Sequence, residues 1–121
     1  MSPLTSHLSP VFLMCRPTYY RIAYEINPWM SLKRPALRAR ALEQWQQLYA
    51  TLTRTLHVRV QLLAPRRGVP DLVFTANAGL VHGKTLIRSN FRYIQRQPEE
   101  ALVDAHFTRR GYRIVTLPDR Y

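Results

Sequence analysis

Residues Pro70–Leu80 read PDLVFTANAGL, and this stretch decides the fold that the sequence predicts. The apolar run at residues 72–74 is typical of a covered strand, so we expect a strand over residues 71–81. Asp71 stands at the entrance of this run, Asn77 follows it, and Gly79 lets the backbone pass close to another group. Polar groups at both ends of a buried strand need partners. A bound polar ligand would supply them; alternatively, Asp71 caps a turn and Asn77 bonds to its own backbone.

The residues before this stretch predict a strand, a helix and a second strand. Strands are expected at residues 12–15 and 58–62, where the second alternates apolar and polar side chains. Pro35 fits the first turn of the intervening helix, which should end near residues 55–57. Apolar side chains recur along this helix at spacings of three and four, as one face requires. They are Leu37, Ala41, Trp45, Leu48 and Leu52.

The residues after it repeat this plan. A tight turn at His82-Gly83 should lead into a strand at residues 85–88. Pro98 opens a second helix that Gly111 ends, and a last strand is expected at residues 113–117. The chain therefore predicts an α/β fold in one domain, with a first module at about residues 11–64 and a second at about 70–118. Residues 1–10 are expected to be disordered.

Composition narrows the class of protein. Apolar residues make up 46% of the 121 residues, which indicates a globular chain. No apolar run is long enough for a membrane span, and residues 1–10 lack the pattern of a signal peptide, so we expect a cytoplasmic protein. The one cysteine excludes an internal disulfide and a multi-cysteine metal site.

The net charge of the chain suggests a second possible class of function. Lysine and arginine total 18 against 7 acidic residues, for a net charge of +11, and all but two of the basic residues are arginine. Such a balance suits a small basic nucleic-acid-binding protein. The arginines are scattered without a long run, however, which favours a compositional bias or a missing acidic partner segment. We therefore keep nucleic-acid binding as the alternative function.

Four motifs occur in order along the chain and carry a resemblance. They are FLMCRP at residues 12–17, YEINPWM at 24–30, PDLVFTANAG at 70–79 and Arg96-Gln97 before the second helix. Together they resemble the guanidino-group-modifying enzymes of the pentein superfamily, which include arginine dihydrolases, dimethylargininases, arginine deiminases and amidinotransferases. The resemblance runs from about residue 12 to 118. It implies the first two modules of an incomplete pentein-type α/β propeller.

The same resemblance implies a substrate site. Asp71 and Asn77 match positions that face the substrate, Arg96 matches an arginine that binds the substrate carboxylate, and Asn27 matches a residue at the pocket mouth. Dimethylargininase-like members carry an acid where Asn77 stands, so the amide favours the dihydrolase-like branch. Asn27 can equally shape a turn before its proline. Arg96 can be a solvated arginine, and Arg92 competes with it for the inward position.

The resemblance also implies what lies outside the chain. Family members use a cysteine nucleophile and a histidine acid/base, both in later modules, after an acidic segment that would follow Pro118. Cys15 lies in an apolar strand and is expected to be inert. His57, His82 and His106 show no metal-ligand spacing, and we expect neither metal nor cofactor. We therefore expect the N-terminal part of a hydrolase or amidinotransferase for arginine or a related guanidine. Such a part would be inactive alone, with a missing C-terminal part or a second copy as partner; hydrolysis and transfer stay open.

Overall fold

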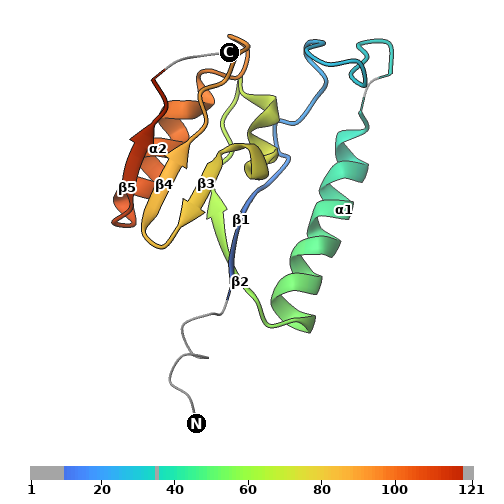
Figure 1. Ribbon diagram of the computed structural model, residues 1–121. Helices are drawn as coiled ribbons and strands as arrows, with labels where there is room; N and C mark the ends of the chain where they lie inside the picture. The colour runs from blue at the N-terminus through green and yellow to red at the C-terminus, as the bar shows by residue number, and fades with distance from the viewer. Residues whose placement is uncertain (1–9, 35, 119–121) are drawn as a thin grey trace.

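The computed structural model describes residues 10–34 and 36–118, and within them it has the expected α/β fold (Figure 1). The predicted disorder at residues 1–9 and the predicted helix start at Pro35 lie outside the described residues. One sheet pairs two strands and the other pairs three, in the order β3-β4-β5. No helix in the described part of the chain is long and apolar enough to cross a membrane.

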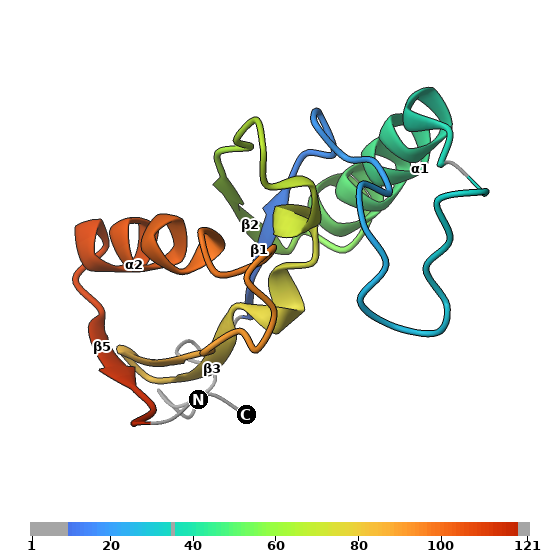
Figure 2. The same ribbon diagram turned by 90° about the horizontal axis from the view of Figure 1, so that it is seen from above.

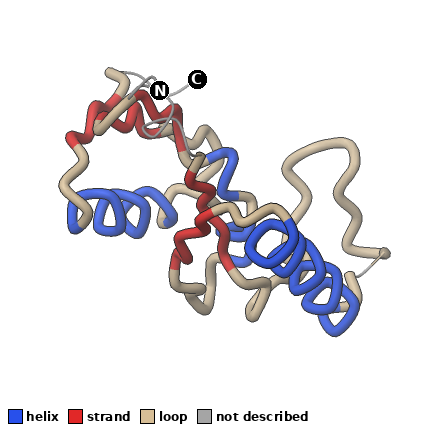
Figure 3. The backbone as a smooth tube through the Cα atoms, turned by 90° about the horizontal axis from the view of Figure 1, so that it is seen from below, coloured by secondary structure: helices blue, strands red, loops and turns tan. Residues whose placement is uncertain are grey.

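The first sheet is a parallel pair joined by a helical crossover. β1 (Val11–Cys15) pairs with β2 (Arg59–Leu63) in a register that sets Val11 opposite Arg59 and Cys15 opposite Leu63. Between them α1 (Arg38–Ala50) continues through a π-helical turn at Thr51–Thr55, which confirms the predicted end of the helix. None of the α1 side chains is buried, and Figures 1 and 3 show the helix standing beside the two strands. Its apolar face is thus incompletely covered.

The second sheet combines a hairpin with a parallel crossover. β3 (Gly79–His82) and β4 (Thr85–Arg88) are antiparallel and are joined through Gly83, whose φ of 57° suits glycine. α2 (Glu99–Arg109) then crosses one face of the sheet, as Figure 2 shows, and returns the chain to β5 (Arg113–Thr116), parallel to β4. The predicted helix, its glycine stop and the last strand are confirmed.

The strand predicted over residues 71–81 is wrong up to residue 78. Pro70–Val73 and Thr75–Asn77 form two short 3₁₀ turns, and the strand begins only at Gly79. Backbone bonds from Phe74 N to Asp71 O and from Ala78 N to Thr75 O close these turns at 3.0 Å each. A three-residue apolar run fits a buried turn as well as a strand, and Pro70 favours the first turn of a helix.

The core lies where the two sheets, the 3₁₀ turns and α2 meet. Its buried members are Cys15, Leu63, Val69, Leu72, Ala78, Leu86, Val103 and Phe107. Thr75 ties the turns to the first sheet, because its Oγ1 donates to Leu13 O at 2.7 Å. At Gly79 a Cβ would collide with the carbonyl oxygen of Ile87, which confirms the expected close backbone approach.

Candidate functional site

All four residues that the sequence predicted for the site line one cavity of about 370 Å³. They are Asp71, Asn77, Arg96 and Asn27. The rest of the cavity wall is formed by apolar and aromatic side chains from the loop between β1 and α1, together with Phe74 between the two 3₁₀ turns. The other lining residues are Tyr20, Ile22, Ile26, Trp29, Met30 and Phe74. The structure thus brings the four residues together, while their role in binding a substrate stays a prediction.

The two 3₁₀ turns account for how Asp71 and Asn77 come to share this cavity. As a strand, six residues would span about 20 Å, whereas a 3₁₀ path of the same length spans about 12 Å. The shorter path lets Arg96 contact both positions: its Nη2 donates to Asp71 O at 3.1 Å and its Nη1 donates to Asn77 Oδ1 at 2.9 Å. The 3₁₀ turns that replace the predicted strand therefore bring the site residues together.

Arg96, rather than Arg92, is the arginine that faces the cavity. Arg92 is exposed, and its guanidinium lies 5.5 Å from the ring centre of Tyr93. Arg96 is held over the ring of Phe91 at 4.4 Å and pairs with Glu99 through two hydrogen bonds of 2.8 Å. With the two bonds to Asp71 and Asn77, four of its five N–H donors are used, and one on Nη1 remains.

Glu99 is a site residue that the sequence analysis missed. It is 2% exposed, and its carboxylate forms the fork-to-fork pair with Arg96 that fixes the guanidinium plane. Burial lowers the pKa of Arg96, but the hydrogen bond and charge of Glu99, with the charge of Asp71, outweigh it and leave that pKa raised. A signal for this pair was present in the sequence, because the two residues are three apart at the start of a helix.

Tyr24 is the second missed residue. Its hydroxyl donates to Asp71 Oδ2 at 2.7 Å, across 47 residues of sequence, and no local pattern predicts such a contact. Burial raises the pKa of Tyr24, and the hydrogen bond and charge of Asp71 raise it further, so the phenol stays protonated at neutral pH. Asp71 is 4% exposed, and its Oδ1 accepts no hydrogen bond from the described residues. That oxygen is the free acceptor of the site.

Asn27 uses its side-chain oxygen locally. Oδ1 accepts hydrogen bonds at 3.0 Å from the backbone N–H groups of both Trp29 and Met30. This is the turn-forming role that the sequence left open as the alternative. Since Asn27 also lines the cavity, its contribution is to shape the loop that carries Trp29, with its amide nitrogen still available as a donor.

Cys15 is buried in β1, as the sequence predicted, and belongs to the core together with Leu72 of the first 3₁₀ turn. It is 1% exposed, and burial raises the pKa of its thiol to about 11, with Glu99 adding to the shift. A thiol with that pKa is a poor nucleophile at neutral pH. Among residues 10–34 and 36–118, no group of three or more histidine, cysteine or acidic side chains is placed to hold a metal ion.

The arrangement suits a small planar cation. Asp71 and Glu99 set two buried carboxylates against the one guanidinium of Arg96, which leaves one negative charge in excess. Asp71 Oδ1 can accept from an N–H donor of such a cation, whereas the amide nitrogen of Asn77 can donate only to an acceptor such as a carboxylate. The rings of Tyr20 and Phe74, 5.8 Å apart and edge to face, form an apolar wall beside these groups. A carboxylate acceptor beside an aromatic surface is a combination that suits a guanidinium group.

Comparison with known proteins gives a consistent set of relatives, although no protein-family model matches the chain. The chain is 47% identical over 108 residues to the bifunctional arginine dihydrolase/ornithine cyclodeaminase AgrE of Nostoc sp., covering 88% of the chain and 15% of that protein. It is 35% identical over 105 residues to the N(G),N(G)-dimethylarginine dimethylaminohydrolase of Mycobacterium tuberculosis, covering 87% of the chain and 34% of that enzyme.

The fold agrees with these sequences. The crystal structure of an AgrE mutant in complex with L-arginine superimposes with a TM-score of 0.82 at 46% sequence identity, covering 90% of this chain and 16% of that one. The chain thus spans about a sixth of the length of AgrE. Its likeness is to the N-terminal part of that protein, and the predicted resemblance to the pentein superfamily and the expected α/β fold are both confirmed.

Proposed function

Starting from its homology to the N-terminal part of the guanidino-group-modifying (pentein) enzymes, we propose that this chain forms the arginine-binding part of an arginine-hydrolysing enzyme. The observation that carries the proposal is the cavity in which Asn27, Asp71, Asn77 and Arg96 meet. The relatives are named for hydrolysis of arginine or of dimethylarginine, which favours hydrolysis over amidino transfer. The alternative of nucleic-acid binding gains no comparable support from a specific site.

Each cavity group has a defined task in this proposal. Asp71 Oδ1 accepts hydrogen bonds from the substrate guanidinium, and Tyr24 holds the other carboxylate oxygen in place. Asn77 is a neutral amide where dimethylargininase-like enzymes carry an acid, so Asp71 is left as the principal charge partner of the guanidinium. The amide nitrogen of Asn77 donates to the substrate carboxylate. Arg96 offers its remaining Nη1 donor to the substrate carboxylate, and Glu99 keeps that donor aimed at the cavity.

The chain alone does not turn over arginine in this proposal. Attack on the resonance-stabilised guanidinium carbon needs an activated thiolate and a proton donor for the departing amine. Cys15 supplies no thiolate at neutral pH and packs in the core. The nucleophile and its acid/base partner would come from the partner region that completes the propeller.

Ligand selectivity tests the binding role. The chain, labelled with ¹⁵N, is titrated with L-arginine, with L-citrulline, which lacks the positive charge, and with agmatine, which lacks the carboxylate. We expect L-arginine to bind weakly, on the order of 1 mM, because the cavity is open. L-Citrulline should shift the amide signals of Asn77 and Trp29 far less at the same concentration, and agmatine should fall between them.

Two variants sharpen the test. Asp71→Asn should remove the preference for L-arginine over L-citrulline, whereas Asp104→Asn, which removes a carboxylate paired with Arg88 in another part of the chain, should preserve it. Equal binding of the two amino acids by the unaltered chain would contradict the proposal. Turnover is assayed as ammonia, citrulline and ornithine formed from arginine. Product formation by the unaltered chain that is lost in Cys15→Ala would contradict the proposal that the chain alone is inactive.

A further inference from the structure

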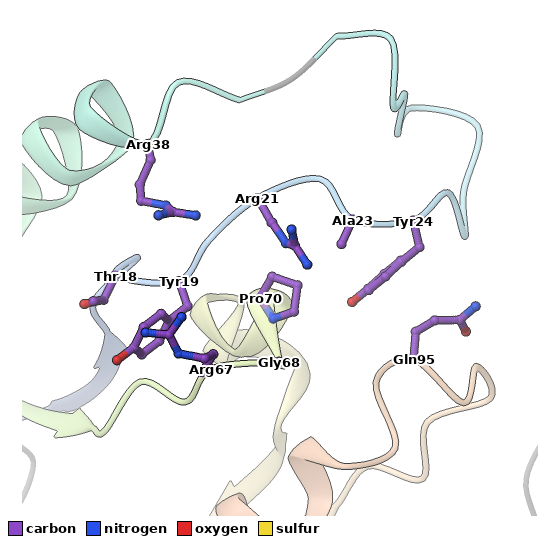
Figure 4. A pocket seen from close by; sticks show the side chains of 10 residues that line it. All are labelled: Thr18, Tyr19, Arg21, Ala23, Tyr24, Arg38, Arg67, Gly68, Pro70 and Gln95. Atoms are coloured by element: carbon purple, nitrogen blue, oxygen red, sulfur yellow. The ribbon is translucent and has the colours of Figure 1, made fainter.

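A second cavity, of about 510 Å³, lies next to the candidate site and is lined by a different kind of side chain. Its walls come from residues 18–24, from the start of α1, from the loop before the first 3₁₀ turn and from Gln95 (Figure 4). This volume is in the range of small-molecule sites. Tyr24 lines the cavity and, through its bond to Asp71, borders the candidate site as well.

Three exposed arginines line this cavity, and no acidic residue lines it. Arg21 and Arg38 project toward the same space from two separate segments, and Arg67 lies on the wall beside Tyr19 (Figure 4). The carboxylate of Asp71 accepts the hydroxyl of Tyr24, which lines this cavity, but Asp71 itself lines the candidate site instead. Three like charges around one hollow repel one another, and a bound anion would relieve that repulsion.

The donors of these arginines are largely unused by the described residues. Arg38 donates one hydrogen bond, from Nε to Tyr20 O at 3.1 Å, so both of its terminal nitrogens are still available as donors to a ligand. Arg67 stacks against Tyr19, with its guanidinium 5.2 Å from the ring centre, which orients the group without consuming a donor. Arg21 forms no hydrogen bond or ion pair with any residue in ranges 10–34 and 36–118. Planar guanidinium groups with free N–H edges match carboxylate and phosphate oxygens.

We propose that this cavity is a binding site for a small anion carrying two or more negative charges, of the phosphate or polycarboxylate class, held by Arg21, Arg38 and Arg67. The site is separate from the arginine-binding cavity, whose charged groups favour a cation. A compact polyanion fits better than a single carboxylate, because three guanidinium groups from three segments can each contact a different oxygen. Arginine itself is a poor occupant, since its own guanidinium would add a fourth positive charge.

The test uses pyrophosphate and citrate as probes of the 121-residue chain at physiological salt, measured by isothermal titration calorimetry. Arg21→Gln, Arg38→Gln and Arg67→Gln are compared with Arg113→Gln, an exposed arginine on β5 outside this cavity. All four variants lose one positive charge, so non-specific attraction to a basic protein falls equally in each. We expect about a tenfold loss of affinity for at least one probe in each cavity variant, since charge-assisted hydrogen bonds are involved. Arg113→Gln should change it less than about twofold.

A second readout locates the bound probe. Binding should move the backbone amide signals of Gly68 and Ala23, which line the cavity, and leave those of β5 in place. Binding of one probe only would assign the site to that probe's class. An equal loss of affinity in all four variants, shifts spread over the whole basic surface, or no binding of either probe would each overturn the proposal.

Discussion

The pair of Arg96 and Glu99 should couple strongly in a double-mutant cycle. Arg96→Met leaves the carboxylate of Glu99, which is 2% exposed, without its partner of two 2.8 Å hydrogen bonds. Stranding one member of a buried pair costs about 3–5 kcal/mol. Against a total of roughly 5–15 kcal/mol for a domain, this loss is large.

The other two corners of the cycle have different expected values. Glu99→Leu should cost less, about 2–3 kcal/mol, because Arg96 keeps its contacts to Asp71 O and Asn77 Oδ1. The double variant Arg96→Met/Glu99→Leu replaces the pair with apolar side chains and should be no less stable than Arg96→Met alone. The resulting coupling energy is then at least about 2 kcal/mol.

Urea unfolding followed by circular dichroism measures each corner. Arg92→Met is the matched control, since it removes an exposed arginine four residues earlier and should change the free energy of unfolding by less than about 0.5 kcal/mol. If the effects of the two single variants simply add in the double variant, the pair is solvated rather than buried. Glu99 could then not be the group that positions Arg96.

Three further predictions concern the core and the turns. Gly79→Ala should lower the free energy of unfolding by about 2 kcal/mol or more, because its Cβ would strike the carbonyl oxygen of Ile87; thermal unfolding that matches the unaltered chain would contradict this. Burial, aided by neighbouring arginines, lowers the pKa of His106 from 6.5 to about 4, so the unfolded chain binds the proton more readily. Stability should accordingly fall as the pH drops from 6.5 toward 4, by up to about 3 kcal/mol, and His106→Leu should flatten this dependence in urea titrations at a series of pH values. Cys15, with its pKa raised to about 11, should react with iodoacetamide at pH 8 only when the chain is unfolded, so rapid labelling of the native chain would show that its burial is not maintained.

The regular elements could be predicted from the sequence because their signals are local. α2 begins after Pro98 and ends before Gly111, as the proline and glycine positions indicated. β2 was indicated by the alternation at residues 58–62, and β4 by the tight turn at His82-Gly83. The first part of the strand predicted over residues 71–81 was wrong, because the three apolar residues at 72–74 carry no period that separates a strand from a turn. Tertiary contacts decided there, with Leu72 turned into the core and Phe74 left exposed.

The candidate site was predicted unevenly. Asp71, Asn77, Arg96 and Asn27 were found through resemblance, and the structure places all four around one cavity. Tyr24 could not be found, because its contact with Asp71 joins segments 47 residues apart. The burial of Glu99 also escaped, since acidic residues in a first helical turn ordinarily face solvent and favour the helix dipole. Glu99 here does both: it lies in the first turn of α2, where it favours the helix dipole, and it pairs with Arg96.

Local charge, rather than the net charge of +11, decides what each cavity can hold. Charges beyond about 8 Å are largely screened at physiological salt, so a scattered excess of arginine acts weakly on either cavity. Around Asp71 the nearby carboxylates outnumber the one guanidinium, whereas around Arg21 three guanidinium groups face no lining carboxylate. The bond between Tyr24 and Asp71 lies between these two environments. A chain whose composition suggests only affinity for anions therefore offers a cation a site of its own, a short distance from one that suits an anion.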